Sequence, residues 1–118
     1  MNKELKSIFG TSIAVEGSSV PTAHLRYKGK SKTFVTWTVL GEEPALAGDD
    51  ECLYSVVEVD VDIFSDKNYK EIVRTIKKLM NENEWVWTGD SPEMYEDDTE
   101  LYHLTCTFKK ERSLEWHE

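Results

Sequence analysis

Cysteine, proline and glycine are scarce in this chain of 118 residues, which contains two, three and six of them. Cys52 and Cys106 lie far apart and lack the paired spacing that a structural zinc site requires, so bound zinc is not expected. Both stand in apolar patterns typical of strands, where cysteine behaves as a small buried hydrophobe. We therefore expect two reduced thiols in the core.

Basic residues are also in the minority, because 14 Lys and Arg face 23 Asp and Glu and give a formal net charge of −9. Specific nucleic-acid binding is not expected, since gripping a phosphate backbone needs cationic side chains. No apolar run approaches the roughly 20 residues of a membrane-spanning helix, and the first residues lack the apolar stretch of a signal peptide. We expect no membrane association and a chain that works where it is made.

Aromatic residues are plentiful, with four Trp, five Tyr and four Phe. This composition is typical of a folded globular domain, because disordered chains are poor in aromatic residues. The length suits one domain with one hydrophobic core, so we expect residues 1–118 to fold as a unit. Within this unit, the charged segment 109–118 is expected to be a frayed tail.

The spacing of apolar residues predicts two helices. The segment 2–9 carries its apolar residues on one helical face. From Tyr69 onward, one amphipathic stripe covers about three turns. Ser65 or Asp66 can cap this helix, and Asn81 and Asn83 can end it. The residues of the stripe are Ile72, Val73, Ile76, Leu79 and Met80.

Alternation of apolar and polar residues predicts the strands. The clearest case is 53–64, where valine and isoleucine occupy one face while Glu58, Asp60 and Asp62 occupy the other. Glycine, proline and acidic residues interrupt the alternation elsewhere and indicate loops. The other expected strands are 24–27, 33–40, 84–88 and 101–108, and the expected loops are Gly41–Glu51 and Gly89–Glu100.

The order of these elements indicates the fold class. Helices and strands are partly segregated along the chain, and neighbouring strands can pair as hairpins. The sequence therefore predicts the α+β class: a single domain with a mostly antiparallel sheet, one long amphipathic helix and a short N-terminal helix packed on it.

No constellation of residues points to catalysis. Glu58, Asp60 and Asp62 project from one strand face, but such neighbours lie about 7 Å apart and do not converge on a metal ion unaided. The acids at 96–98 lack the spacing and central glycine of a calcium loop. An acid could orient His103 as a general base, yet neither a nucleophile nor a phosphate-binding glycine loop accompanies it. We expect no enzyme activity, no cofactor and no bound metal.

Acidic and basic residues occupy separate stretches of the chain. Residues 42–66 and 82–100 contain many acids and no base. The helix between them carries the bases Lys67, Lys70, Arg74, Lys77 and Lys78. A positive face on one copy can meet a negative face on the next, which suits head-to-tail assembly. The alternative is that these stretches are solvated loops and a solvated helix face.

Two of the four tryptophans indicate an interface. Trp85 and Trp87 share one face of the expected strand 84–88, with Val86 opposite. Because tryptophan is enriched at protein interfaces, we expect this face to be buried in a partner.

Three segments, in this order, match the pattern of one known family. The first is Thr36-Trp37-Thr38-Val39-Leu40-Gly41-Glu42-Glu43-Pro44-Ala45-Leu46-Ala47-Gly48-Asp49-Asp50-Glu51. The second is Val61-Asp62-Ile63-Phe64-Ser65 with the later Lys78-Leu79-Met80, and the third is Tyr95-Glu96-Asp97-Asp98-Thr99-Glu100-Leu101-Tyr102-His103. Over about residues 33–108, the chain resembles the small tail-completion proteins of phages and prophages, which are grouped with the tail terminators of long-tailed bacteriophages.

The resemblance implies a structural virion protein that acts by assembly. Six copies would form a ring that caps the tail tube and offers a surface to the head–neck complex. The partners implied are further copies of the chain, the tail tube protein and the head–neck connector proteins. The protein would be part of the virion tail and would be assembled in the bacterial host cytoplasm.

The resemblance also gives roles to the charged segments. A basic helix on one subunit would meet an acidic loop on the next. The face of Glu58, Asp60 and Asp62 is expected to line the lumen of the ring, where negative charge would let DNA pass without sticking. The residues expected at interfaces are Pro44, Leu46, Asp49, Asp50, Arg74, Lys77, Trp85, Trp87, Tyr95, Glu96 and Asp98.

Three alternatives stay open from the sequence. The chain could be a head–tail joining (neck) protein of the same virion. It could be a small metal-dependent hydrolase that uses His103 with Glu96 or Asp98. It could also be an acidic inhibitor protein that mimics nucleic acid and binds a basic partner.

Overall fold

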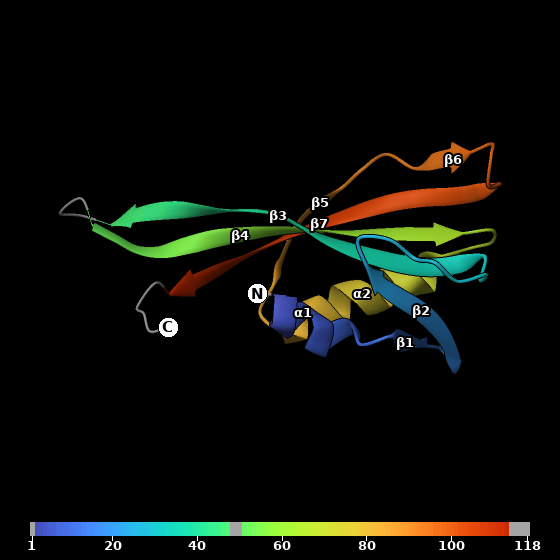
Figure 1. The fold of residues 1–118 in the computed structure, drawn as a ribbon, viewed down its shortest axis with the longest axis horizontal. Coiled ribbons are helices and arrows are strands. Elements are labelled where there is room, and N and C mark those ends of the chain that lie inside the picture. The colour runs from blue at the N-terminus through green and yellow to red at the C-terminus, as the bar shows by residue number, and fades with distance from the viewer. Residues whose placement is uncertain (1, 48–50, 114–118) are drawn as a thin grey trace.

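The computed structural model describes residues 2–47 and 51–113 (Figure 1). The chain order begins with helix α1 and ends with strand β7. The elements are α1 (Asn2–Phe9), β1 (Ser12–Val15), β2 (Ser18–His24), β3 (Thr33–Ala47), β4 (Glu51–Ser65), α2 (Lys70–Glu82), β5 (Val86–Asp90), β6 (Met94–Glu96) and β7 (Leu101–Ser113).

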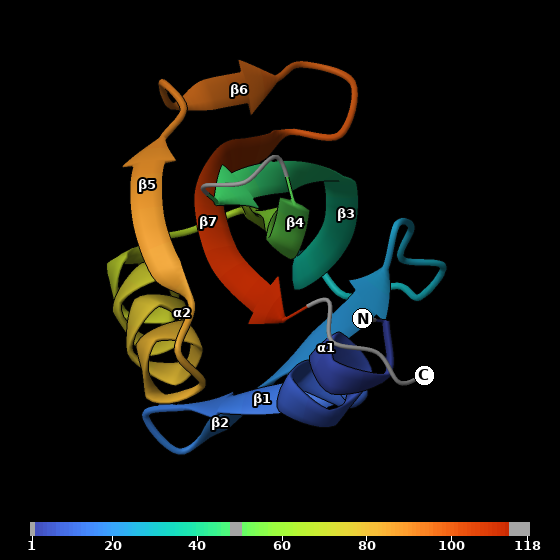
Figure 2. The same cartoon turned by 90° about the vertical axis from the view of Figure 1, so that its left-hand side faces the viewer.

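All the strands join in one seven-stranded sheet with the order β1-β2-β3-β4-β7-β5. β6 pairs with the beginning of β7, so β5 and β6 follow one another along the same edge. β2 runs parallel to β3, and the other pairs are antiparallel. Figures 1 and 2 show α1, α2 and the β1–β2 hairpin grouped on one side of the central strands β3, β4 and β7.

The expected fold class is wrong, because the chain is mostly β-sheet. Strands hold 54% of the residues and helices 20%, and the longer helix has only 13 residues. The excess of strand comes from segments expected to be loops. β3 continues through Gly41 and Pro44 to Ala47, since antiparallel pairing with β4 outweighs the local preferences of these residues.

The C-terminal expectation also needs correction. Residues 109–113 continue β7 and pair with β4, with Lys110 opposite Val57 and Ser113 opposite Tyr54. This part of the chain is therefore an ordered strand and not a frayed tail. Residues 114–118 lie outside the described part.

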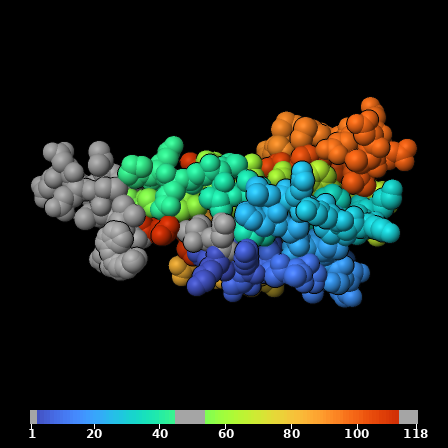
Figure 3. All heavy atoms as spheres, viewed as in Figure 1, coloured from blue at the N-terminus to red at the C-terminus, as the bar shows by residue number. Residues whose placement is uncertain are grey.

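Three of the strands extend beyond the helices and form what we call the arm: β3 from Gly41, β4 as far as Val56, and β7 from Glu111. The molecule measures 52 × 25 × 23 Å, and the arm accounts for its elongation (Figure 1). In the space-filling view the β3 surface projects along the long axis past α1 (Figure 3). Glu42 crosses the arm, accepting a hydrogen bond from Ser55 and pairing with Arg112 at 3.2 Å.

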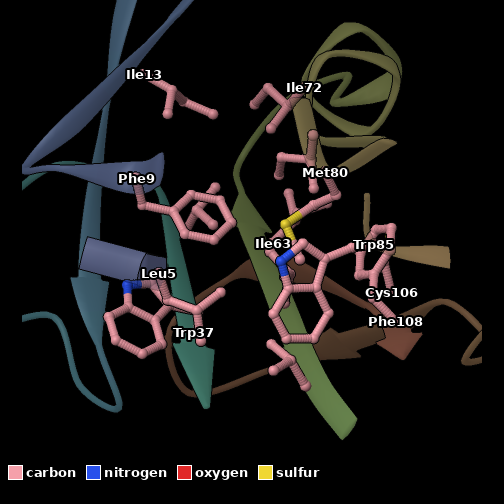
Figure 4. Packing of buried hydrophobic residues seen from close by; sticks show 14 of the residues in the cluster. Leu5, Phe9, Ile13, Trp37, Ile63, Ile72, Met80, Trp85, Cys106 and Phe108 are labelled. Atoms are coloured by element: carbon pink, nitrogen blue, oxygen red, sulfur yellow. The ribbon is translucent and has the colours of Figure 1, made fainter. Parts of the chain in front are cut away.

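The core lies between the sheet and the two helices. Leu5 and Phe9 of α1 enter it from one side, and Ile72 and Met80 of α2 enter it from the other (Figure 4). The sheet contributes Trp37, whose ring stacks on Phe9 with a centroid distance of 6.3 Å, and the alternating residues of β4. Those β4 residues are Val57, Val59, Val61 and Ile63. Cys106 is a buried free thiol of this core, whereas the side chain of Cys52 lies outside the described residues.

The beginning of α2 differs from the expected caps, whereas the helix ends at the expected C-cap residue, Asn83. Ser65 is buried at the end of β4, and its hydroxyl accepts a hydrogen bond from the backbone N–H of Lys67. The helix begins only after Tyr69. At the other end, Glu84 adopts a left-handed conformation with φ 69°. The backbone N–H of Trp85 donates to Met80 and that of Glu84 donates to Asn81, the two bonds of a Schellman ending. The chain thereby leaves α2 with Trp85 aimed into the core.

Candidate assembly surfaces

A shallow groove of about 440 Å³ lies between α2 and β7. Residues four apart share a helix face, so Tyr69 and Val73 form one row and Lys70 and Arg74 form the next. Leu104 of β7 completes the apolar part. We call the lining residues the α2 groove: Tyr69, Lys70, Val73, Arg74, Lys77 and Leu104.

Lys77 stands at the β5 side of the α2 groove. Its Nζ lies 3.0 Å from Oδ2 of Asp90 and 4.2 Å from the ring centroid of Trp87. The indole N–H of Trp87 also donates to Asp90, at 2.8 Å. Burial alone would raise the pKa of Asp90, but the hydrogen bonds from Trp87 and Lys77 outweigh it and hold the pKa below its ordinary value. This cluster fixes the predicted interface residues Lys77 and Trp87 side by side.

Arg74, the other predicted basic residue, is far more open. Its guanidinium lies 2.8 Å from Glu71, and its side chain is 74% exposed. An exposed pair one helical turn apart contributes little to stability and leaves the guanidinium accessible. Lys70 makes no ion pair within residues 2–47 and 51–113. Arg74 and Lys70 are therefore available to carboxylates from outside the molecule.

Tyr69 closes the end of the α2 groove nearest β6. Its hydroxyl donates a hydrogen bond to Glu93, and its ring lies 6.4 Å from that of Tyr102. Burial, followed by the hydrogen bond and charge of Glu93, raises the pKa of Tyr69 to about 12. Tyr95, a predicted interface residue, is half exposed and meets Tyr102 edge to face at 5.1 Å.

Trp85 is not at a surface, contrary to its predicted place in an interface. It is 1% exposed and packs against Met80 in the core (Figure 4). Its indole N–H donates to Glu4 at 3.3 Å, and the ammonium group of Lys110 lies over its ring. Strand β5 begins only at Val86, so Trp85 belongs to the helix ending and does not share a face with Trp87, which is 49% exposed.

The acidic row on β4 faces away from the helices, as alternation predicted, and two of its members bond side chains of β7. Asp62 accepts a hydrogen bond from Thr105 and lies 2.9 Å from Nε2 of His103. Asp60 accepts a hydrogen bond from Thr107 at 2.7 Å. These bonds tie β4 to β7 across the sheet. That this face lines a ring lumen remains a prediction.

His103 lies between two carboxylates. Besides Asp62, Oε2 of Glu96 lies 3.6 Å from its Nδ1, and the ring stacks on Phe64 at 4.1 Å. The Thr105 hydroxyl near the ring donates to Asp62. The cluster joins β4, β6 and β7, which suits a structural role for His103. Asp98, the other acid named with it, is exposed in the turn after β6.

The remaining predicted residues lie at the arm. Pro44 is exposed on β3, and the backbone of Leu46 pairs with that of Cys52. The side chain of Leu46, as well as Asp49 and Asp50, lies outside the described residues. The structure thus brings Arg74, Lys77 and Trp87 together beside α2 and places Pro44 on the arm.

Three apolar lining residues were missed by sequence reasoning: Tyr69, Val73 and Leu104. Val73 belongs to the predicted apolar stripe of the helix, whereas Tyr69 and Leu104 are not among the predicted interface residues. Each is only partly buried. The signal for Tyr69 and Val73 is their place at the margin of the apolar stripe, next to the row of bases. Leu104 lies on a separate strand and carries no such signal.

Comparisons with known proteins add no relative. No protein-family model matches the chain, and a search of curated proteins finds no match. Within the described residues, no group of three or more His, Cys, Asp and Glu side chains could hold a metal ion. No helix of the described part has the length and apolar character to cross a membrane. Membership of the tail-completion family therefore remains a prediction from the motifs.

Proposed function

We propose that this chain is a structural protein of a phage tail, which closes the tail tube by ring-like self-assembly and joins it to the head–neck complex. The resemblance in the segments 36–51, 61–65 with 78–80, and 95–103 supports the proposal. In the structure these segments contribute to β3 with its part of the arm, to the end of β4, to the last turns of α2, and to β6 with the start of β7. They include one strand of the arm, while the α2 groove lies outside them.

The observation that carries the proposal is the polarity of the molecule. The arm projects at one end of the 52 Å axis without helices beside it, while the α2 groove with its bases belongs to the helical part (Figure 1). Two different surfaces on one chain favour a head-to-tail contact, and head-to-tail contacts close into rings when the rotation between copies permits it.

Assembly in this proposal needs no catalytic group. The bases of α2 and the acids of the arm would steer copies into register, because exposed charges mainly set orientation and association rate. The exposed apolar residues would supply most of the binding energy on burial. Those exposed by half or nearly so are Leu25, Leu40, Val86, Trp87, Met94 and Tyr95.

Deletion of the coding sequence from the phage that carries it tests the proposal. We expect tails whose tubes are irregular in length and carry no head, because nothing closes the tube. Purified protein added to such a lysate should restore joining of heads and tails. Tails of normal length joined to heads without the protein would contradict the proposal.

The same experiment separates the proposal from the neck alternative. A neck protein acts on tails that are already closed, so its deletion would leave tubes of uniform length beside unjoined heads. Tube length in electron micrographs therefore decides between the two roles. Uniform tubes would assign the chain to the neck.

A further inference from the structure

We propose that the α2 groove binds the end of the arm, residues 45–51, from a second copy of this chain. The inference rests on the self-assembly proposed above and names the two surfaces that meet. It concerns one contact, repeated from copy to copy, in which the groove of each molecule receives the arm of its neighbour.

The α2 groove is suited to an apolar residue followed by acids. Tyr69, Val73 and Leu104 offer apolar surface, and Lys70, Arg74 and Lys77 supply three cations without an acid among the lining residues. Three acids lie next to the groove. Glu71 forms an ion pair with Arg74, and Asp90 forms one with Lys77. Glu93 accepts a hydrogen bond from Tyr69. Since Lys70 has no ion pair in the described part and Arg74 is 74% exposed, the groove retains positive charge for a partner.

The end of the arm has the matching composition. Its sequence is Ala45-Leu46-Ala47-Gly48-Asp49-Asp50-Glu51, so one leucine is followed within five positions by three acids. No base occurs between residues 42 and 66. Leucine can bury apolar area against the groove while the acids pair with its cations.

The shape of the fold directs this contact to another molecule. β3 and β4 run as paired strands to Ala47 and from Glu51, so the arm continues the direction of the sheet. It points away from α2, which lies beneath the other part of the sheet (Figure 1). The arm therefore cannot fold back onto its own groove, and the contact joins different copies head to tail.

Two arms could instead pair edge to edge as strands, but the edge of β3 is less suited to this contact than the arm end is to the α2 groove. The free edge of β3 in the arm carries Gly41 at a register shift and Pro44, which has no N–H to donate. Bulges and prolines are features by which sheet edges resist pairing with other chains. The structure thus favours docking of the arm end over extension of the sheet.

Complementary charge reversals test the contact. The groove variant is Lys70→Glu with Arg74→Glu, and the arm variant is Asp49→Lys with Asp50→Lys. The control is Lys28→Glu with Lys30→Glu, which makes the same charge change as the groove variant at exposed positions between β2 and β3. Self-association is measured by sedimentation velocity over a range of concentrations, and circular dichroism verifies that each variant is folded.

We expect the groove and arm variants each to associate at least about tenfold more weakly than the control. An equimolar mixture of the two should recover most of the lost affinity, because each groove then meets an arm of opposite charge. A groove variant that associates as tightly as the control would overturn the contact, and so would a mixture no tighter than its components.

A photo-crosslinker placed at Leu46 tests proximity directly. Peptide mapping should recover cross-links to the segment 69–77 of another copy. Cross-links to a different surface, or none at a protein concentration of 1 mM, would overturn the contact. The deletion phenotype tests the proposed function separately. If the protein closes tails but its self-association is unchanged by the charge reversals, the proposed function stands and only this contact is overturned.

Discussion

At the scale of the residue, Asp90 shows how the charges beside the α2 groove are held in place. Its carboxylate accepts hydrogen bonds from the side chains of Trp87 and Lys77, which lower its pKa. A group whose pKa is lower in the folded state stabilises that state above its ordinary pKa. The contribution is lost as the pH falls through the folded pKa.

Replacing Asp90 by Asn tests this. We expect Asp90→Asn to lower the free energy of unfolding by about 0.5–1.5 kcal/mol at pH 7, since a charge-assisted bond is lost. The difference from the wild type should shrink as the pH falls below 3.8, the ordinary value for this carboxyl. Urea unfolding between pH 7 and pH 2 measures it. A difference of constant size at all pH values would contradict the assignment.

Cys106 affects the stability of the fold at alkaline pH, whereas Asp90 affects it at acidic pH. Burial, and then the neighbouring Asp90, raises the pKa of its thiol to about 12. The unfolded thiol ionises from about pH 9 while the folded thiol stays neutral, so folding becomes less favourable as the pH rises above 9. Tyr69, with its pKa raised to about 12, adds to this loss above pH 10.

The variant Cys106→Ala isolates the thiol. At pH 7 we expect a loss of about 1 kcal/mol, because a small buried side chain is shortened. Between pH 8 and pH 10.5 the variant should lose stability less steeply than the wild type, which urea titrations at each pH reveal. Parallel slopes for the two proteins would show that the thiol is not the group responsible.

At the scale of the element, the ending of α2 decides where Trp85 lies. Glu84 holds the left-handed position of the Schellman ending, where a side chain costs about 1 kcal/mol that glycine avoids. We therefore expect Glu84→Gly to raise the free energy of unfolding by about 0.5–1 kcal/mol, with Glu84→Ala as the control that gains nothing. Thermal unfolding followed by circular dichroism is the measurement. A glycine variant less stable than the alanine variant would contradict the geometry.

The elements also show which structural features can be predicted from a sequence. Alternation of valines located β4, and the apolar stripe located α2, because both patterns depend on burial of one face. The same patterns failed for Gly41 and Pro44, whose local preference for loops yields to pairing with β4. They failed for Trp85 too, since alternation cannot reveal that a helix ending, and not a strand, carries this residue.

The candidate surfaces were predictable to a similar extent. The row of bases containing Arg74 and Lys77 is readable from helical spacing alone. The apolar part of the α2 groove is not, because it forms only when α2 packs against β7 and leaves Leu104 partly open. A prediction of binding residues from one sequence therefore favours charges and misses the apolar surface between elements.

At the scale of the whole molecule, the elongated shape and the separation of the arm from the α2 groove make self-assembly the central claim. Light scattering of the purified protein over a range of concentrations, at low and at high salt, tests it most directly. We predict a mass well above 13.7 kDa that grows with concentration towards a discrete oligomer and is reduced by salt, because the contact joins opposite charges. A mass of 13.7 kDa at every concentration and at both salt levels would contradict the account.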